Sequence, residues 1–508
     1  MKRKLISLFL GVVMAVGSVA MLASCTEKNG PTTTLPPLDI DPNDRFLEKL
    51  PSDLNFEKEG MEGEDLIVNV AYVEGGNGDF TRRSLQADEL DESTVDIKTL
   101  ERDKRLKSQL GLELYIEQVS DAFHGMDGAI GTALAAGESD FDVLAGYQYF
   151  GIGMAAKGYL INLTDLAVDD ADYIDLEAPY WGKAFNDNMS YKGAYFWITG
   201  DIALRYIGGM YCTFVNSTIY TNKLEATHGS IYTIAKEGKW TIDLMQTMAS
   251  ACYEDNGNTP GETDNEDTYG FGWEQMDPMD GLALGCGAQF CYKDPETGDV
   301  SIVFASSHNY SISDKINALC KGNEYSYEYA GSDSVNVMTA FSQGTLAFTV
   351  NKLFMSEVYL EEMDDFYIVP APKYDENQAN YITGVHDGCT IFGITHCTEK
   401  VRQSAAALEF LCAYSSELVA PEYYEGALKG RYTRDSQAAE MIDLIHDNVT
   451  TDFAIAWGES INNIGQIYRS AGKITNKTIN RDRTKWEQSL TKLTEALNQY
   501  ASGGEVVE

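Results

Sequence analysis

Positive charge is scarce in this sequence. Its 508 residues include 38 lysines and arginines but 78 aspartates and glutamates, so the formal net charge at pH 7 is −40. A chain this acidic repels nucleic acid and anionic lipid headgroups, because both are negatively charged. The composition therefore argues against nucleic acid as a partner and leaves a neutral ligand open.

Motifs that mark common kinds of catalysis are also missing. The sequence has no Gly-x-Ser-x-Gly elbow, no His-Glu-x-x-His pair and no phosphate-binding loop. Its six histidines show no metal-ligand spacing, and no Cys-x-x-Cys pair indicates a zinc site. We therefore predict a protein that is not an enzyme and that uses no metal and no cofactor.

Long apolar runs are absent except at the amino terminus. An apolar stretch covers residues 5–22 and follows three basic residues at positions 2–4. No later stretch has the ~20 apolar residues needed to cross a bilayer. A basic start, an apolar middle and small residues before a cut are the layout of a secretory signal.

The end of this stretch indicates lipidation. Residues 22–25 read Leu-Ala-Ser-Cys, which resembles the lipoprotein box of bacteria. Small residues before a cysteine suit a peptidase and then attachment of lipid to the thiol. We predict a signal peptide over residues 1–24 and a mature chain that begins at the lipidated Cys25. The protein would then be anchored to the extracytoplasmic face of the cell membrane without spanning it.

Residues 25–62 are predicted to form a disordered tether. Five of the 12 prolines of the chain lie at or before Pro51, and the segment has little apolar patterning. Such a segment buries too little surface to fold, and its prolines keep it extended. Removal of residues 1–24 takes away three basic residues and no acidic ones, which brings the net charge to −43.

Eight cysteines remain besides the predicted lipidation site, and most lie in apolar surroundings. Exported chains in oxidising places usually pair such thiols. Buried reduced thiols in an organism that lives without oxygen are the alternative, which we favour. The eight are Cys212, Cys252, Cys286, Cys291, Cys320, Cys389, Cys397 and Cys412.

Beyond the tether, short apolar runs alternate with helix-like stretches. Residues 66–72 have the nearly continuous apolar character of a strand buried on both faces. The order that follows is a helix over 94–110 ended by Gly111, a strand over 112–116, a helix over 126–136 and a strand over 141–145. This β-α-β-α-β order predicts a parallel sheet, whose ligands bind beyond the carboxyl ends of its strands. After about residue 400, helices are predicted over 398–414, 434–446 and 484–500.

Several segments over about residues 65–430 together resemble extracellular solute-binding proteins of family 1, the carbohydrate type of ABC importer component. One reads Gly-Glu-Ser-Asp-Phe-Asp-Val over 137–143, and another reads Phe-Ser-Gln-Gly-Thr-Leu-Ala-Phe over 341–348. The others cover 155–160, 163–166, 212–216, 231–241, 267–271 and 366–373.

The resemblance implies a two-lobe α/β fold, like that of periplasmic binding proteins, which closes on a solute like a flytrap. Lobe one is expected over residues 63–205 and 381–420, and lobe two over 206–380 and 421–508. Several crossings between the lobes imply a multi-segment hinge, and the C-terminal part is expected to be helical. Members of the family hand their solute to a membrane permease.

A sugar presents apolar ring faces edged by hydroxyls, so its binder needs flat aromatic surfaces and planar acceptors. Tyr147, Gln148 and Tyr149 follow the third strand and are candidates, although this group could instead pack the lobe. Glu74 opens a glycine-rich loop after the first strand, where the backbone can approach a ligand closely, or which is simply flexible.

Four further candidates come from other segments. Asp201 lies before the crossover and could accept two hydroxyls, or it could form a structural salt bridge with Arg205. Trp273 is the best stacking candidate and Trp457 the second, and Asp387 lies in the returning segment. Trp240, by contrast, precedes a helix start at Thr241 and is predicted to lie in the core. A faint calcium-loop pattern over 254–267 lacks its glycine and its terminal glutamate, which favours a solvated acidic loop.

The sequence thus predicts a lipid-anchored binder that captures a sugar or oligosaccharide and delivers it to an ABC permease. A secreted glycoside-active enzyme that uses two carboxylates is one alternative. A binder of a peptide or another polar solute on the same fold is a second. A lipoprotein that senses rather than imports is a third.

Overall fold

The computed structural model describes residues 47–75, 80–87, 93–256, 267–329, 336–363, 365–428 and 435–501, without the side chains of 167–169. The predicted signal peptide and Cys25 lie outside the described residues, as does most of the calcium-like loop. Among the described residues, no helix combines the length and the apolarity needed to cross a membrane.

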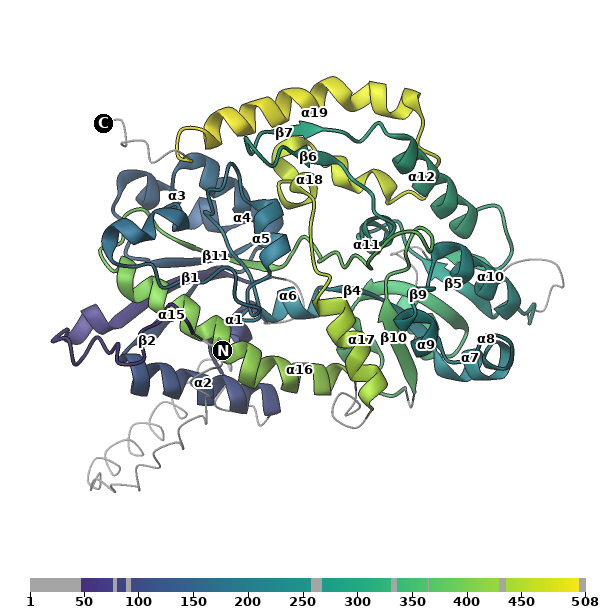
Figure 1. Cartoon of the computed structure of the whole chain (residues 1–508), viewed down its shortest axis with the longest axis horizontal. Helices are drawn as coiled ribbons and strands as arrows, with labels where there is room; N and C mark the ends of the chain where they lie inside the picture. Colours follow the sequence, from purple (N-terminus) through teal and green to yellow (C-terminus); the bar gives the residue numbers. More distant parts are fainter. Residues whose placement is uncertain are drawn as a thin grey trace, which may run out of the picture. The chain divides into compact units, whose positions relative to one another are not determined.

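The first sheet has four strands in the order β11-β3-β1-β2 (Figure 1). Its parallel strands are β1 (Ile67–Val73), β2 (Glu113–Ser120) and β3 (Val143–Tyr147). β11 (Thr390–Ile394) returns from far along the chain and pairs with β3 in the antiparallel sense. The predicted parallel sheet is confirmed, and its carboxyl ends point toward the loop after Tyr147.

The two helices that connect these strands have the predicted bounds, α2 (Thr94–Leu110) and α3 (Met126–Ala136). α2 begins where the Ser93 hydroxyl accepts a hydrogen bond from the amide of Asp96, at 3.1 Å. It ends at Gly111, whose φ of 75° lies in the left-handed region that a side chain disfavours. The predicted end of this helix at Gly111 is therefore confirmed.

The second sheet has five strands in the order β10-β4-β9-β5-β8. β5 runs parallel to β8 and β9, whereas β4 is antiparallel to β9 and β10. Every residue of β4, β5 and β9 is buried, as expected of a sheet covered on both faces. The strands are β4 (Tyr211–Asn216), β5 (Tyr269–Trp273), β8 (Ser326–Glu328), β9 (Leu346–Lys352) and β10 (Phe366–Pro370).

Most of the remaining elements cover these sheets. The helices are α1 (Phe80–Leu85), α4 (Gln148–Gly151), α5 (Lys183–Met189), α6 (Leu204–Gly208), α7 (Ser217–Lys223), α8 (Glu225–His228), α9 (Ile231–Lys236), α10 (Ile242–Cys252), α11 (Pro278–Gly285), α12 (Ser307–Cys320), α13 (Val337–Ser342), α14 (Met355–Tyr359), α15 (Val401–Tyr414), α16 (Ala420–Ala427) and α17 (Ser436–His446). Shorter pieces are η1 (Gly63–Leu66), η2 (Ile152–Lys157), η3 (Leu163–Asp169), the π-helical η4 (Ser415–Val419), and the hairpin of β6 (Cys291–Lys293) and β7 (Val300–Ile302). The predicted helices at 398–414 and 434–446 are confirmed as α15 and α17.

The chain crosses between the two sheets several times. It leaves the first sheet through α6, returns between β10 and β11, and leaves again through α15 and α16. Isolated bridges tie neighbouring crossings together, Met210 to Val385 and Thr383 to Val449. The predicted two-lobe α/β fold with a multi-segment hinge is therefore confirmed. Lobe one denotes below the part around the first sheet, and lobe two the part around the second.

After α17 the chain runs back along both lobes. This part contains α18 (Phe453–Ala456), η5 (Glu459–Ile461), η6 (Ile464–Tyr468) and α19 (Asn476–Leu497). In Figure 1, α19 extends from the side of α3 to that of α12. We call residues 453–501 the C-terminal strap. Its long helix was predicted over 484–500, so the start was placed eight residues too late.

The predicted tether ends earlier than residue 62. Leu50, Leu54 and Phe56 are buried, and the amide of Phe56 donates to the carbonyl of Leu110 at 2.9 Å. The prediction was wrong for these residues because the apolar side chains are too sparse to show a period. They nevertheless cover the C-terminal end of α2.

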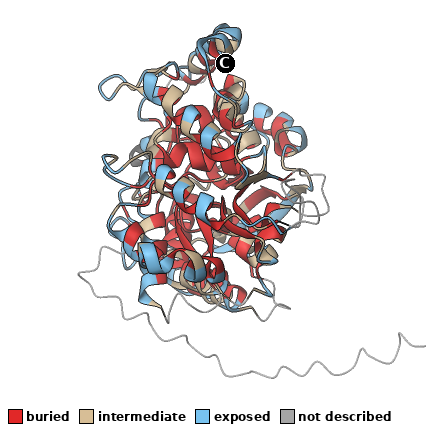
Figure 2. Cartoon of the chain, turned by 90° about the vertical axis from the view of Figure 1, so that its right-hand side faces the viewer, coloured by how far each residue is buried: buried red, intermediate tan, exposed pale blue. Residues whose placement is uncertain are grey.

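The core confirms the sequence interpretation of Trp240. This residue is fully buried, its Nε1 donates to the carbonyl of Pro370 at 3.0 Å, and Thr241 caps α10. Figure 2 shows the buried residues on the inner sides of the helices and the exposed ones outside. The eight cysteines are free thiols, and all but Cys397 are buried, which raises the pKa of several and makes them poor nucleophiles.

Candidate functional site

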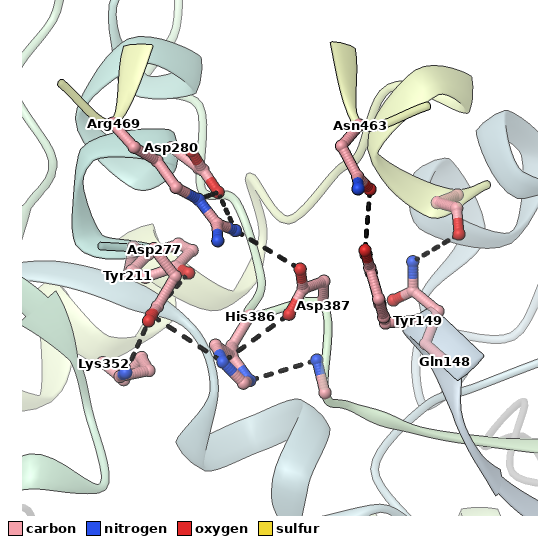
Figure 3. A network of polar contacts seen from close by, with 12 residues as sticks. Gln148, Tyr149, Tyr211, Asp277, Asp280, Lys352, His386, Asp387, Asn463 and Arg469 are labelled. Atoms are coloured by element: carbon pink, nitrogen blue, oxygen red, sulfur yellow. Dashed lines mark hydrogen bonds and ion pairs between the residues drawn. The ribbon is translucent and has the colours of Figure 1, made fainter. Parts of the chain in front are cut away.

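Polar side chains converge at the boundary between the two lobes (Figure 3). They come from the end of β3 and the adjoining α4, the start of α11, the end of β9, the segment before β11, and the C-terminal strap. Ligands of parallel sheets bind beyond the carboxyl ends of the strands, where α4 begins. The residues are Tyr147, Tyr149, Asp277, Asp280, Lys352, His386, Asp387, Asn463 and Arg469.

Asp277 organises one part of this network. Its carboxylate accepts hydrogen bonds from Lys352 Nζ at 2.7 Å and from the Tyr211 hydroxyl at 3.1 Å, and His386 Nε2 lies 3.8 Å away. Burial alone would raise the pKa of Asp277, but the neighbouring His386 and Lys352 outweigh it and keep the pKa below its usual value. Asp277 is therefore an ionised carboxylate with its partners already in place.

Asp280 lies one turn further along α11 and differs from Asp277. Arg469 donates to its Oδ2 through Nε at 2.9 Å and Nη2 at 2.6 Å. Its Oδ1 is buried and has no hydrogen-bond partner. Burial, together with the charges of Asp387 and Asp277, raises the pKa of Asp280 to about 7 despite the neighbouring Arg469. A buried acceptor without a donor is unfavourable, so this oxygen is available for a ligand.

Lobe one contributes aromatic surface to the same place. The Tyr149 hydroxyl donates to Asn463 Oδ1 at 2.8 Å, and its amide donates to the carbonyl of Asp387 at 2.9 Å. The Tyr147 ring lies 4.4 Å from that of Phe123 and packs against Gly388, where a Cβ would come within 2.2 Å of the tyrosine. The glycine thus permits the close approach of the two loops.

The cavity between these groups is small in this structure. Tyr149, Asp280, Asp387, Asn463, Gln466 and Arg469 are among the residues that line it. Its volume is about 10 Å³, enough for about one water molecule. A pocket for a drug-sized ligand has roughly 300–1,000 Å³. A saccharide can therefore enter only if the lobes separate or the C-terminal strap moves.

Two larger hollows lie elsewhere along the lobe boundary. One of about 390 Å³ is lined by residues that include Trp181 and His446, and one of about 430 Å³ by residues that include Tyr292 and Asp452. Among the described residues, neither hollow contains a buried side-chain polar atom that lacks a partner. The small cavity contains such an atom, Asp280 Oδ1, and is therefore a better candidate site than either hollow.

Three of the predicted residues meet at this site: Tyr147, Tyr149 and Asp387. Asp387 faces Arg469, with Oδ2 at 3.4 Å from Nη2, and its Oδ1 lies 3.6 Å from His386 Nε2. The ring of Tyr147 meets that of His386 edge-on at 6.3 Å. Their role as ligand contacts stays a prediction, but their proximity supports it.

Gln148 and Glu74 have structural partners. Gln148 is 1% exposed, donates to the carbonyl of Ala456 at 3.2 Å and accepts from Cys389 Sγ at 3.0 Å. Glu74 accepts from the amide of Thr81 at the start of α1, at 2.6 Å, and its other oxygen pairs with Arg205 at 2.7 Å. Both side chains thus hold loops of lobe one in place. Residues 76–79 of the predicted glycine-rich loop lie outside the described residues.

The alternative that Asp201 forms a salt bridge with Arg205 was wrong. Arg205 instead pairs with Glu74, which follows the first strand. Asp201 is 3% exposed and pairs with His446 Nε2 at 2.9 Å. Burial by itself would lower the pKa of His446, but the charge and the hydrogen bond of Asp201 raise it to about 10. The pair connects α17 of lobe two to the crossover.

The two predicted tryptophans are both buried. Trp457 donates from Nε1 to the carbonyl of Met189 at 2.9 Å and lies against Phe453, so it anchors the C-terminal strap on lobe one. Trp273 is 2% exposed, Lys321 Nζ lies 5.2 Å from its ring centroid, and its Nε1 has no partner. Neither residue contacts the small cavity, and their stacking on a sugar stays a prediction.

Sequence reasoning missed Asp277, Asp280, Lys352, Asn463 and Arg469. A signal existed for the first two, since an Asp-Pro-x-Asp sequence after a buried strand begins a helix at the ligand-facing edge of the sheet. No local signal could have found Arg469, because only the path of the C-terminal strap brings it there. Within the described part of the chain, no cluster of three His, Cys, Asp or Glu side chains could hold a metal ion.

No family model matches the sequence, and no curated protein matches it. Similar solved structures exist. The ABC substrate-binding protein Lmo0181 from Listeria monocytogenes in complex with cycloalternan is 14% identical, with a TM-score of 0.49, over 86% of this chain and 99% of that chain. UgpB from Mycobacterium tuberculosis in complex with glycerophosphocholine is 12% identical, with a TM-score of 0.49, over 84% and 97%.

Maltose-bound MalE3 of T. maritima is 14% identical, with a TM-score of 0.47, over 85% of this chain and 99% of that chain. These similar structures are thus binding proteins in complex with sugars or another small solute. Because identities and TM-scores are this low, no ligand or partner follows from them. The two-lobe assignment accordingly rests on the two sheets and their crossings.

Proposed function

We propose that this chain is the lipid-anchored, extracytoplasmic solute-binding component of an ABC importer and that it captures a saccharide between its lobes. The observation that carries the proposal is the meeting of Tyr149, Asp387 and Asp280 around one cavity at the lobe boundary. A tyrosine ring offers apolar surface to a sugar ring, and carboxylates accept hydrogen bonds from its hydroxyls. The proposed role is binding, without covalent chemistry.

Closure of the lobes would couple binding to delivery. Ordered crossings such as the Met210–Val385 bridge let the lobes rotate about a narrow region. A solute that contacts both lobes binds the closed form better and shifts the population toward it. A permease that recognises the closed form would then receive only loaded protein.

A thermal-shift screen tests the binding role. The chain from residue 26 would be heated with mono- and oligosaccharides, peptides and polyamines. A ligand that binds only the folded state raises the melting temperature with its concentration. We expect a shift with a saccharide series that Tyr149→Ala reduces and that Tyr115→Ala, at an exposed tyrosine of β2, leaves unchanged. A shift with peptides or polyamines alone would contradict the saccharide assignment.

Lipid anchoring is tested separately. We expect a Cys25→Ala variant to lose incorporation of radiolabelled palmitate and to leave the membrane fraction, because the thiol is the proposed attachment point. A Cys397→Ala variant, at the half-buried thiol, is the matched control. Unchanged labelling of the Cys25 variant would contradict the anchor without affecting the proposed binding site.

A further inference from the structure

The C-terminal strap is bound to lobe one at several points. Trp457 Nε1 donates to the carbonyl of Met189 at 2.9 Å, and Tyr191 donates to Asn498 Oδ1 at 3.2 Å. Between these anchors, Asn463 accepts the hydrogen bond of Tyr149. The strap therefore covers the side of lobe one that carries the predicted sugar-binding tyrosine.

The same segment is bound to lobe two. The Tyr468 hydroxyl donates to the carbonyl of Asn309 at 3.0 Å, and Asn317 Nδ2 donates to the carbonyl of Ala471 at 2.8 Å. Arg469 lies between these two anchors and reaches Asp280. The strap thus places one of its own cations in the boundary between the lobes, as Figure 3 shows.

The ion pair of Arg469 and Asp280 leaves hydrogen-bonding capacity unused. Arg469 donates through Nε and Nη2, whereas its Nη1 donates to no group among the described residues. Asp280 is 7% exposed, and its Oδ1 is without a partner although both residues line the cavity. One donor and one acceptor are therefore available in a single ion pair, in which the Asp280 side chain is 10% and the Arg469 side chain 23% exposed.

A pair of neighbouring hydroxyls matches these two atoms. One hydroxyl can donate to the carboxylate oxygen while its neighbour accepts from the guanidinium, and hydrogen bonds to charged groups are the stronger kind. The contact of Arg469 Nη2 with Asp387 Oδ2 is 3.4 Å long, beyond the usual range of about 2.7–3.2 Å, so little is lost when a solute replaces it.

We infer that Arg469 and Asp280 are the specificity-determining pair of the site and that they bind two neighbouring hydroxyls of the solute. This inference rests on the proposed function. It assigns to the C-terminal strap a direct part in recognition, and it requires a ligand with a diol rather than an isolated hydroxyl. The strap shifts with the lobes when the solute enters, because the cavity is otherwise too small.

The test begins with the parent chain and a fixed panel of glucose, maltose, maltotriose, cellobiose and xylobiose. The saccharide that gives the largest thermal shift is then titrated by calorimetry into the parent, Asp280→Asn and Arg469→Gln. The titrations are done at pH 8, where the Asp280 carboxyl, with a pKa of about 7, is mostly ionised and its Oδ1 is an acceptor. Lys473→Ala is the control, since this lysine is in the strap, is exposed, and pairs with the surface residue Asp314.

We expect the dissociation constant to rise about 10- to 100-fold in each of the two variants, the loss typical of a hydrogen bond to a charged group, and to stay unchanged in the control. Asp280→Asn keeps the shape of the side chain and an oxygen that can accept from Arg469, so it decides the matter if Arg469→Gln does not fold.

Parent-like affinity in Asp280→Asn would overturn the inference and leave the proposed function standing. If no saccharide of the panel shifts the parent, the proposed function loses its ligand class and the inference falls with it.

Discussion

Asp277 and Asp280 begin the same helix, three residues apart, yet their surroundings have opposite effects. Asp277 has Lys352 and Tyr211 as partners, and its pKa is held below the usual value. Asp280 has a buried oxygen without a partner, and its pKa is raised to about 7. A fully paired carboxylate has no oxygen left for a ligand, whereas one that is half paired costs stability and has an oxygen available to a ligand.

The largest expected effect on the free energy of unfolding comes from removing the cation that pairs with each of these two carboxylates. Lys352→Met leaves Asp277 as a buried charge without its ammonium partner, although the Tyr211 hydroxyl still donates to it. We expect this change to lower the free energy of unfolding by about 3–5 kcal/mol. Arg469→Met should cost less, because Asp280 can take up a proton instead. Urea denaturation at pH 6.5 measures both. Equal losses in the two variants would break the contrast between the carboxylates.

The second effect is on the pH dependence of stability. The pKa of Asp280 is raised from 3.8 to about 7, so between these values the folded state holds a proton that the unfolded state has lost. Its contribution therefore makes the free energy of unfolding fall as the pH rises through this window, by up to about 1.4 kcal/mol per pH unit. We expect Asp280→Asn to flatten the profile between pH 4.5 and 7. Asp277→Asn should flatten it less, because it removes only one of the influences that raise the pKa of Asp280.

A third test uses another satisfied pair, Asp201 and His446. The pKa of His446 is raised from 6.5 to about 10, so its stabilisation is complete below pH 6.5 and is lost as the pH rises through 10. We expect His446→Gln to lower the free energy of unfolding by about 1–3 kcal/mol at pH 6. The difference from the parent should narrow toward pH 10.5 in parallel denaturation series. A difference that does not change with pH would show that the imidazolium charge contributes nothing.

The smallest effect on stability is expected from a substitution at Asn463. Asn463→Ala removes one neutral, partly exposed hydrogen bond from Tyr149, which is worth about 1 kcal/mol. Thermal denaturation in the absence of ligand should show a correspondingly small shift. A loss as large as that of Lys352→Met would mean that the strap holds the lobes together more strongly than its contacts indicate.

Local signals in the sequence predicted much of the fold. α2 and α3 have the predicted bounds, and α2 ends at Gly111 as predicted, because such signals act within a few residues of each other. Trp240 was placed in the core from its position before a capping threonine. The burial of Leu50, Leu54 and Phe56 and the short helices of the strap were not predicted, because short segments with few apolar residues show no period.

The candidate site was predicted only in part. Tyr149 and Asp387 follow from strand ends and from the returning segment, which the sequence indicates. The alternative pairing of Asp201 with Arg205 was wrong, since the two are close in sequence while the fold supplies Glu74 to Arg205 from 131 residues away. Arg469 lies 189 residues from Asp280, and no property of either segment specifies that they meet.

The place on the chain where a solute binds can be measured directly by hydrogen–deuterium exchange. The chain from residue 26 would be compared with and without the saccharide that raises its melting temperature most. We predict slower exchange in the amides around residues 147–150, 279–282, 386–388 and 463–469, which surround the small cavity. Protection confined to the hollow near Trp181 and His446, or no protection at all, would contradict the assignment of the site.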